Sequence, residues 1–351
     1  MDEAVLLLER AAALAGDDPC AAGGLAVQAA ELLDGAERYD TLVAAAQLLT
    51  AAADWLRAAS TWAQAAEAAA DDRVRVGHLS SQGKAARSAG RWGEAELAYR
   101  QALALAVEVC GADSAQTAAV RHDLAMTLKY SGGFAEAEHL YRLALDTAKS
   151  TGDANFAAVI YHNLGGLSHA RGMADEGVRW ARQGLRLRKT TAPDPLAVAA
   201  DEGALAALLI DVGHHEEAEA LLMSSRATFT DQLGADHYEV AVVNGNLATI
   251  ALDCGDLATA ESRARLALDG KERALGDRHP ELAPTLTTLG TIRRRCCQRA
   301  EAISLHQRAL DLLVPHVEPG HPLLATIRGN LKIATAMATA PGQDEAAPAH
   351  D

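Results

Sequence analysis

Aromatic residues are scarce in this sequence, since only 4% of its 351 residues are Phe, Trp or Tyr although 49% are hydrophobic. Alternation of β-branched and aromatic residues, which is typical of strands, is almost absent. Most of the hydrophobic share is Ala and Leu, which are strong helix formers. An α/β enzyme of this size would show several strands rich in Val and Ile. The composition therefore predicts a helical protein.

Positive charge is also in short supply, because 32 Lys and Arg residues are outnumbered by 47 Asp and Glu residues, which gives a formal net charge of −15. Sequence-independent binding of nucleic acid depends on cations that neutralise phosphates. Binding to an anionic membrane likewise uses basic segments. No apolar run reaches the length of a membrane span. We therefore expect neither nucleic acid nor a membrane as a partner.

The five cysteines are odd in number and follow no regular spacing, so they do not predict a disulfide framework. Reduced thiols in a cytosol are the simplest interpretation. The first residues are acidic where a secretory signal would be basic. We expect a cytoplasmic protein, and the preference for Arg over Lys and for Ala indicates a bacterial genome of high GC content.

An internal repeat is the strongest signal in the sequence. Segments similar to Gly90–Leu103 recur with a near-constant step of about 42 residues, and the six copies begin at Gly90, Gly132, Gly172, Gly213, Gly255 and Cys297. A second helical pattern precedes each start, so the unit is a helix A, a short turn and a helix B. The Gly at the start suits a residue with positive φ at the end of helix A.

Two positions of helix B stay small in every copy, which allows the two helices to approach closely. They are Ala95, Ala137, Gly177, Ala218, Ala260 and Ala302, and then Ala102, Ala144, Gly184, Ser225, Ala267 and Ala309.

This pattern resembles the tetratricopeptide repeat, whose standard unit has about 34 residues. The extra residues here lie between helix B and the next helix A, in three linkers that carry His237, His279 and His321. Their Leu-Gly…His-Pro…Ala signature is similar to that of the kinesin-light-chain-like family. Pro280 and Pro322 are expected in the first turn of helix A. The resemblance is weakest in residues 172–190.

The predicted fold is all-α, a right-handed superhelical solenoid of helix–turn–helix repeats of about 42 residues. Residues 1–52 are expected to form irregular N-terminal helices, at 2–15, 19–35 and 38–52, which are divergent repeats, a cap or an output module. Residues 53–338 are expected to form the repeat array with a final capping helix. Residues 339–351 are expected to be a disordered tail.

The resemblance implies a concave groove lined chiefly by helix A. Groove positions are expected three, six and ten residues before each start. They include Lys84, Arg87, His122, Lys129, His162, His169, Gly245, Thr249, Thr287, Thr291 and Arg294. Basic and neutral polar side chains at these positions favour a partner with carboxylates, such as an acidic peptide or a free C-terminus. The alternative is that they are only solvated helix residues.

Other conspicuous residues have plain structural interpretations. The run Arg293–Arg299 suits the end of a helix, which favours cations, although it is also suited to gripping a phosphate or an acidic segment. Adjacent Cys296 and Cys297 lack the two-residue gap of zinc sites. His214–Glu217 falls in a turn, where exposed polar residues are expected. Trp55, Trp62 and Trp92 are predicted to be core residues, with Trp180 left open.

We find no catalytic constellation, phosphate loop or metal motif. The prediction is a non-catalytic adaptor or scaffold without cofactor or metal, which binds a protein or peptide. Alternatives are a regulator that senses a short peptide, and an accessory subunit of an enzyme complex. The sequence does not identify the partner or the oligomeric state.

Overall fold

The structure is a computed structural model that describes residues 2–191 and 194–336. The predicted tail and the last two residues of the predicted array lie outside the described residues. The chain divides into two compact units, Met1–Leu208 and Leu209–Asp351. Every regular element in the described residues is a helix, so the prediction of an all-α fold is confirmed.

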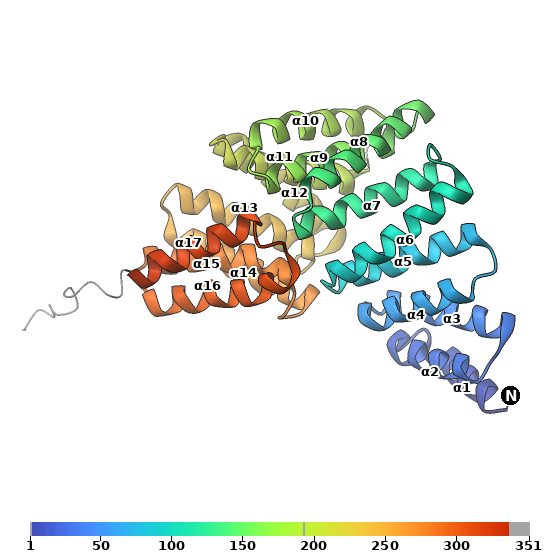
Figure 1. Ribbon diagram of the computed structural model, residues 1–351. Coiled ribbons are helices and arrows are strands. Elements are labelled where there is room, and N and C mark those ends of the chain that lie inside the picture. Colours follow the sequence, from blue (N-terminus) through green and yellow to red (C-terminus); the bar gives the residue numbers. More distant parts are fainter. Residues whose placement is uncertain (1, 192–193, 337–351) are drawn as a thin grey trace, which may run out of the picture. The chain divides into compact units, whose positions relative to one another are not determined.

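In the first unit, helices α1 to α10 each pack against the next one in the sequence (Figure 1). Helix α11 follows them and crosses the division between the units. The bounds are α1 (Asp2–Leu14), α2 (Pro19–Glu31), α3 (Gly35–Ala51), α4 (Trp55–Ala68), α5 (Asp72–Ser88), α6 (Trp92–Cys110), α7 (Ala115–Ser131), α8 (Phe134–Thr151), α9 (Ala154–Ala170), α10 (Ala174–Thr191) and α11 (Pro195–Asp211).

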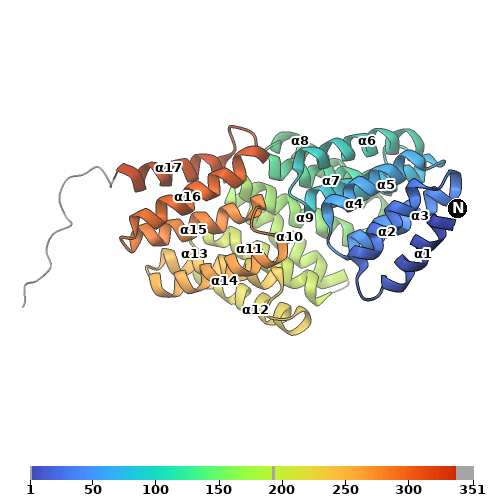
Figure 2. The same cartoon turned by 90° about the horizontal axis from the view of Figure 1, so that it is seen from below.

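In the second unit, helices α12 to α17 pack consecutively in the same way (Figure 2). From α3 onward the odd-numbered helices are A helices and the even-numbered ones are B helices. The bounds are α12 (His215–Leu233), α13 (Tyr238–Asp253), α14 (Leu257–Leu275), η1 (Pro280–Leu282), α15 (Ala283–Arg295), α16 (Arg299–Leu313), η2 (Val314–His316) and α17 (Pro322–Ala336).

The turn between helix A and helix B has the predicted backbone conformation. The five start glycines have φ between +71° and +108°, in the left-handed region that glycine enters without steric cost. Two turns use a residue with a side chain there, namely Cys297 (φ 61°) and Ala53 (φ 55°). Ala53 lies between α3 and α4, so this pair has the same kind of turn as the six repeats. The predicted boundary at residue 52 falls inside this pair.

Within a repeat, helix A contacts helix B through a small residue seven positions before the turn start. At Gly83 an added Cβ would lie 2.8 Å from the ring of Tyr99, and at Gly290 it would lie 2.6 Å from the ring of His306. Tyr99 and His306 are fully buried. In these two repeats a buried ring of helix B therefore fills the space beside the glycine of helix A.

The three linker histidines cap the next helix, a role that the sequence analysis did not assign. The Nδ1 atoms of His237, His279 and His321 each accept a hydrogen bond from the backbone N–H two residues later, at 3.2–3.3 Å. The prolines that follow two of them begin η1 and α17, as predicted. This arrangement satisfies an N–H group at the helix start that has no partner within the helix.

The B helices α6 and α8 of the first unit are joined by an exposed ion pair. The guanidinium of Arg100 in α6 contacts both carboxylate oxygens of Glu136 in α8 at 2.7 Å. It also pairs with Glu96, one turn earlier. The hydrogen bonds from Arg100 hold the pKa of Glu136 below its usual value. Both side chains are more than a third exposed, so the pair adds little to stability.

Two of the three tryptophans predicted to be core residues are buried, namely Trp62 and Trp92. Trp55 is only half-buried at the start of α4. Trp180, which the sequence left open, is half-buried and stacks on Tyr161 with ring centroids 5.8 Å apart.

Candidate binding site on the A helices

The A helices of neighbouring repeats contact one another directly, α5 with α7 and α7 with α9 in the first unit, and α13 with α15 and α15 with α17 in the second. The predicted groove residues of the first unit lie on α5, α7 and α9, and we call the face that carries them the A-helix surface. At these contacts, side chains of one A helix reach the neighbouring A helix. The surface of the first unit is therefore continuous across the repeats.

On α5 the two predicted groove residues differ in environment. Lys84 is exposed. Arg87 is half-buried, and its Nη1 atom lies 2.7 Å from Sδ of Met126 in α7. Arg87 also lies near the buried Tyr99. Burial, with a smaller contribution from Asp123, raises the pKa of Tyr99 well above its usual value, and Arg87 opposes this shift. Arg87 is therefore largely a packing residue, and Lys84 is available to a partner.

On α7 the predicted His122 is buried and forms part of the contact with α9. Its Nδ1 atom donates to Asp123 at 3.2 Å, and its Nε2 atom accepts from the side chain of Asn163 at 2.9 Å. Its ring lies 5.7 Å from that of Phe156 and 5.8 Å from that of Tyr141. Both ring nitrogens are thus engaged, so His122 holds two A helices together.

Lys129 lies in the last turn of α7 and extends over the next A helix. Its Nζ atom is 3.4 Å from the position that a Cβ on Gly166 of α9 would occupy, and 4.6 Å from the centroid of the Tyr130 ring. Gly166 therefore leaves room for the ammonium group. His169, the last predicted residue of α9, is exposed at the end of the same helix.

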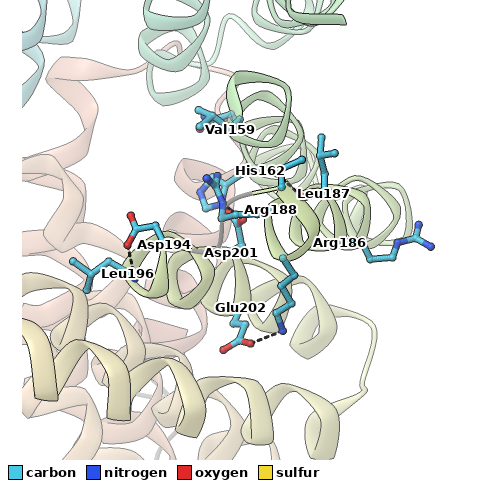
Figure 3. Close-up of polar contacts among 12 residues, drawn as sticks. Val159, His162, Arg186, Leu187, Arg188, Asp194, Leu196, Asp201 and Glu202 are labelled. Atoms are coloured by element: carbon cyan, nitrogen blue, oxygen red, sulfur yellow. Dashed lines mark hydrogen bonds and ion pairs between the residues drawn. The ribbon is translucent and has the colours of Figure 1, made fainter. Parts of the chain in front are cut away.

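His162 belongs to a cluster that involves three helices (Figure 3). Its Nδ1 atom donates to Oδ1 of Asp201 at 2.8 Å, and Nε of Arg188 donates to Oδ2 of the same carboxylate. Asp201 is only 3% exposed, whereas His162 is 31% exposed. Next to it, Lys189 donates to Glu202 at 2.9 Å. His162 therefore keeps one partly exposed edge at the surface.

The acidic members of this surface, Asp123, Asp201 and Glu202, were not predicted from the sequence. They balance part of the positive charge that was predicted from the basic residues alone. A signal for two of them was present, because Asp201 and Glu202 are adjacent acids in the middle of a largely apolar helix, α11. A buried carboxylate of this kind needs a paired cation or hydrogen-bond donors.

The predicted residues of the second unit lie on α13 and α15. The hydroxyl of Thr287 is buried and donates to the Ala283 carbonyl, and Thr291 lies 3.4 Å from Nδ2 of Asn330 in α17. Gly245 and Thr249 are half-buried on α13, where the Thr249 hydroxyl donates to the Gly245 carbonyl. Arg294 is half-buried, and its charge, after burial itself, lowers the pKa of the buried His306.

The arginine run that ends α15 is engaged in structural contacts. Arg293 is buried and pairs with Glu261 and Glu301 of the neighbouring B helices. Arg295 donates to the Leu252 carbonyl at 2.7 Å. These contacts favour the structural interpretation of the run over a phosphate grip.

Residues with metal-binding side chains do not gather in the described part of the chain. Among residues 2–191 and 194–336, no group of three or more His, Cys, Asp or Glu residues is placed to hold a metal ion. His215 pairs with Asp253 at 3.5 Å. Within the same residues, no helix combines the length and the hydropathy that crossing a bilayer requires.

Comparisons with known proteins agree with this architecture. The tetratricopeptide-repeat family model matches residues 77–150 and 239–313. A solved Rap protein, complexed with Competence and Sporulation Factor, has a TM-score of 0.65 at 13% identity, over 86% of this chain and 80% of that chain. A tetratricopeptide-repeat protein from Parabacteroides merdae has a TM-score of 0.51 at 14% identity, over 85% of this chain and 98% of that chain.

A putative kinesin light chain from Podosopora anserina, with nearly identical TPR-like repeats, has a TM-score of 0.46 at 19% identity, over 56% of this chain and 97% of that chain. None of the curated proteins matches the sequence.

The two matched segments are tetratricopeptide repeats, and the consecutive helix pairs and glycine turns of the described residues have the form of such repeats. The repeats resemble those of the kinesin-light-chain-like family, since the repeat period is longer than the standard one and the linkers carry His237, His279 and His321. Both parts of the predicted resemblance are confirmed.

Proposed function

We propose that the protein is a non-catalytic adaptor that binds a protein or peptide on its A-helix surface. The observation that carries the proposal is the continuity of that surface in the first unit. Arg87 with Met126, His122 with Asn163, and His162 with Asp201 each join one A helix to the next. A continuous face that crosses several repeats is what an extended segment of a partner requires.

The charges of the surface support a partner segment that carries carboxylates. Lys84 and His169 reach solvent, and Lys129 extends across Gly166. The acids Asp123 and Asp201 are instead turned to His122 and His162. Lys84 is thus exposed, whereas the carboxylates of Asp123 and Asp201 are hydrogen-bonded within the protein. Such a surface complements an acidic peptide or a free C-terminus.

A scaffold without its own chemistry is consistent with the polar groups that the structure describes. The histidines of the A-helix surface are bound to Asp and Asn side chains that hold the repeats together, and no nucleophile is among these contacts. All five cysteines are free thiols, which supports a reducing compartment such as the cytoplasm. The cysteine usage and the composition together support a bacterial cytoplasmic protein.

The test is affinity capture from the lysate of the native organism, followed by mass spectrometry. Three forms are compared, namely the wild type, Lys84→Glu/Lys129→Glu on the A-helix surface, and Arg10→Glu/Arg179→Glu on α1 and α10. The two variants have the same change of net charge. We expect a partner that the wild type and the α1/α10 variant retain and that the A-helix variant loses. Equal retention by all three would disprove the A-helix site.

The second candidate is a regulator that senses a short peptide. The observation that favours it is the likeness in fold to a Rap protein complexed with Competence and Sporulation Factor, which extends over 86% of this chain. The same capture separates the two functions. A peptide that is recovered alone after denaturing elution would support a sensor, whereas a folded protein partner would support an adaptor.

A further inference from the structure

A pocket of about 370 Å³ lies in the first unit between the B helices α8 and α10, and none of its lining residues is a predicted groove residue. Lys149 in the last turn of α8 forms one side, and Arg186 and Leu187 of α10 form the other. Ala157 and Tyr161 of α9 contribute the remaining wall. The volume is within the range of sites that hold small ligands.

The buried tyrosine of this pocket has an unused donor. Tyr161 is 4% exposed, and its ring stacks on Trp180. The Nε2 atom of Gln183 donates to the Tyr161 hydroxyl oxygen at 2.8 Å. Because the hydroxyl already accepts this bond, its own hydrogen remains for an acceptor. Among the described residues, none accepts it.

The two cations of the pocket have no acidic partner. Nζ of Lys149 lies 5.8 Å from the Tyr161 ring centroid, and Nε of Arg186 donates to the backbone carbonyl of Arg182. In the part of the chain that the structure describes, neither cation is within ion-pair distance of a carboxylate, and none of the lining residues is acidic.

Other B-helix arginines differ from these two cations. Arg100, Arg142 and Arg265 each pair with a glutamate four residues earlier. The residue four positions before Arg186 is Arg182, and the one before Lys149 is Leu145. Figure 3 shows Arg186 pointing away from the cluster of His162, Arg188 and Asp201. In a chain with a net charge of −15, this is an uncompensated positive site.

We propose that this pocket binds a carboxylate that is attached to an apolar group. Lys149, Arg186 and the Tyr161 hydroxyl supply donors for the anion, while Ala157, Leu187 and the tyrosine ring contact the apolar part. A pocket with this apolar wall disfavours a strongly hydrated phosphate, because desolvation of its charge is costly. The carboxylate belongs either to the C-terminus of a peptide or to a free acid. The pocket shares no lining residue with the predicted groove residues, so each proposal stands or fails without the other.

The experiment is isothermal titration calorimetry on the full chain with four probes. The first two are 3-phenylpropionate and its neutral analogue, 3-phenylpropanamide. The other two are the peptide acetyl-Gly-Ser-Gly-Phe with a free C-terminus and the same peptide as its amide. We expect each acid to bind about tenfold or more tightly than its amide, the effect of losing roughly 1.4 kcal/mol of charge-assisted bonding.

Two variants test the assignment to this pocket. Lys149→Glu/Arg186→Glu is expected to weaken binding of the acids by about tenfold or more, because it replaces attraction with repulsion. Arg179→Glu, on the same helix outside the lining, is expected to leave binding unchanged. Circular dichroism melts verify that both variants fold.

Each outcome supports or overturns the proposal. Tighter binding of the free-C-terminus peptide than of phenylpropionate identifies a peptide C-terminus as the ligand, and the reverse identifies a free acid. The proposal is wrong if the acids and amides bind equally, if Arg179→Glu weakens binding as much as the pocket variant, or if no probe binds at millimolar concentration. It is also wrong if inorganic phosphate binds in place of the acids.

Discussion

The pair α7–α8 has Tyr141 nine residues after its turn start, whereas the next pair, α9–α10, has Ala181 at that position. Tyr141 is fully buried, and its partner position on helix A is Ala125. In α9–α10 the partner is Gly165, and an added Cβ there would make only an ordinary contact, 3.4 Å from Cβ of Ala181. At this position of the repeat, a tyrosine ring therefore separates the two helices of α7–α8, whereas the backbones of α9 and α10 come close to each other.

Neighbouring side chains fill the space that the small residues of α10 leave. A Cβ on Gly177 would lie 2.3 Å from Cδ2 of Leu208, and one on Gly184 would lie 3.0 Å from Cβ of Tyr161. The comparison shows that the repeat specifies a distance between helices rather than particular side chains. What matters is the summed volume of the facing residues.

The largest expected effect comes from replacing Tyr141 of the α7–α8 pair with alanine, the residue that the α9–α10 pair has at the same position. Tyr141→Ala should lower the free energy of unfolding by about 3–5 kcal/mol, because it leaves a ring-sized cavity in a core that cannot collapse fully. Tyr141→Phe is the control. The Tyr141 hydroxyl is buried and has no hydrogen-bond partner among the described residues, so its removal should cost nothing. Urea unfolding followed by circular dichroism measures both, and similar losses in the two variants would contradict the comparison.

The next effect concerns the glycines of helix A. Gly83→Ala places a Cβ 2.8 Å from the buried ring of Tyr99 and should destabilise the protein by about 1–3 kcal/mol through overpacking. Gly165→Ala adds the same methyl group where there is room, and should stabilise by up to about 1 kcal/mol through helix propensity. Thermal and urea unfolding of the two variants should therefore shift in opposite directions. Shifts of the same sign would show that the facing residue does not decide the outcome.

A third effect depends on pH. His306 occupies the position of Tyr141 in its own repeat, and burial, followed by the charge of Arg294, lowers the pKa of its imidazole. The unfolded chain therefore binds more protons below about pH 6.5, so stability is full above that pH and decreases as the pH falls, by at most about 1.4 kcal/mol per pH unit.

The matched variant for this effect is His306→Leu, which removes the titrating group and keeps an apolar side chain. Urea midpoints measured between pH 7.5 and 5 should decrease more steeply for the wild type than for the variant. Equal slopes would mean that His306 does not contribute to the pH dependence.

The smallest effect concerns the turn itself. Cys297 has φ 61° where five other repeats have glycine, and a side chain in the left-handed region costs about 1–2 kcal/mol. Cys297→Gly should stabilise the protein by roughly 0.5–1 kcal/mol, because greater freedom of the unfolded chain offsets part of the gain. Differential scanning calorimetry measures the shift. Gln298→Gly, at the N-cap of α16, is the control and should not stabilise.

Much of the fold was predictable because it follows from local rules. The period, the turn glycines and the prolines that begin helix A depend on backbone conformation, which nearby residues determine. The helix bounds in residues 2–51 were less accurate, since α2 ends at Glu31 rather than near residue 35. Apolar periodicity there continues past the residues that are actually helical.

The surface was less predictable, because side-chain partners come from other repeats. His122 and His162 have equivalent places in the repeat pattern, yet one is buried between α7 and α9 and the other keeps an edge at the surface. The burial of His122 depends on Asn163, 41 residues later. Spacing within one helix does not specify which long-range partner is present. The groove residues predicted from spacing therefore stay a prediction, which the variants of Lys84 and Lys129 test.

Within a repeat, the small residue seven positions before the turn start contacts the residue nine positions after it. This contact has a consequence for how repeat chains gain or lose units during evolution. Gly83 in α5 faces Tyr99 in α6, and Gly290 in α15 faces His306 in α16. Because each contact joins two consecutive helices, both partners and the turn between them belong to a single short stretch of the gene. An in-frame duplication or deletion of one repeat carries a complete packing contact with it, so the array is able to grow or shrink by whole units over evolution.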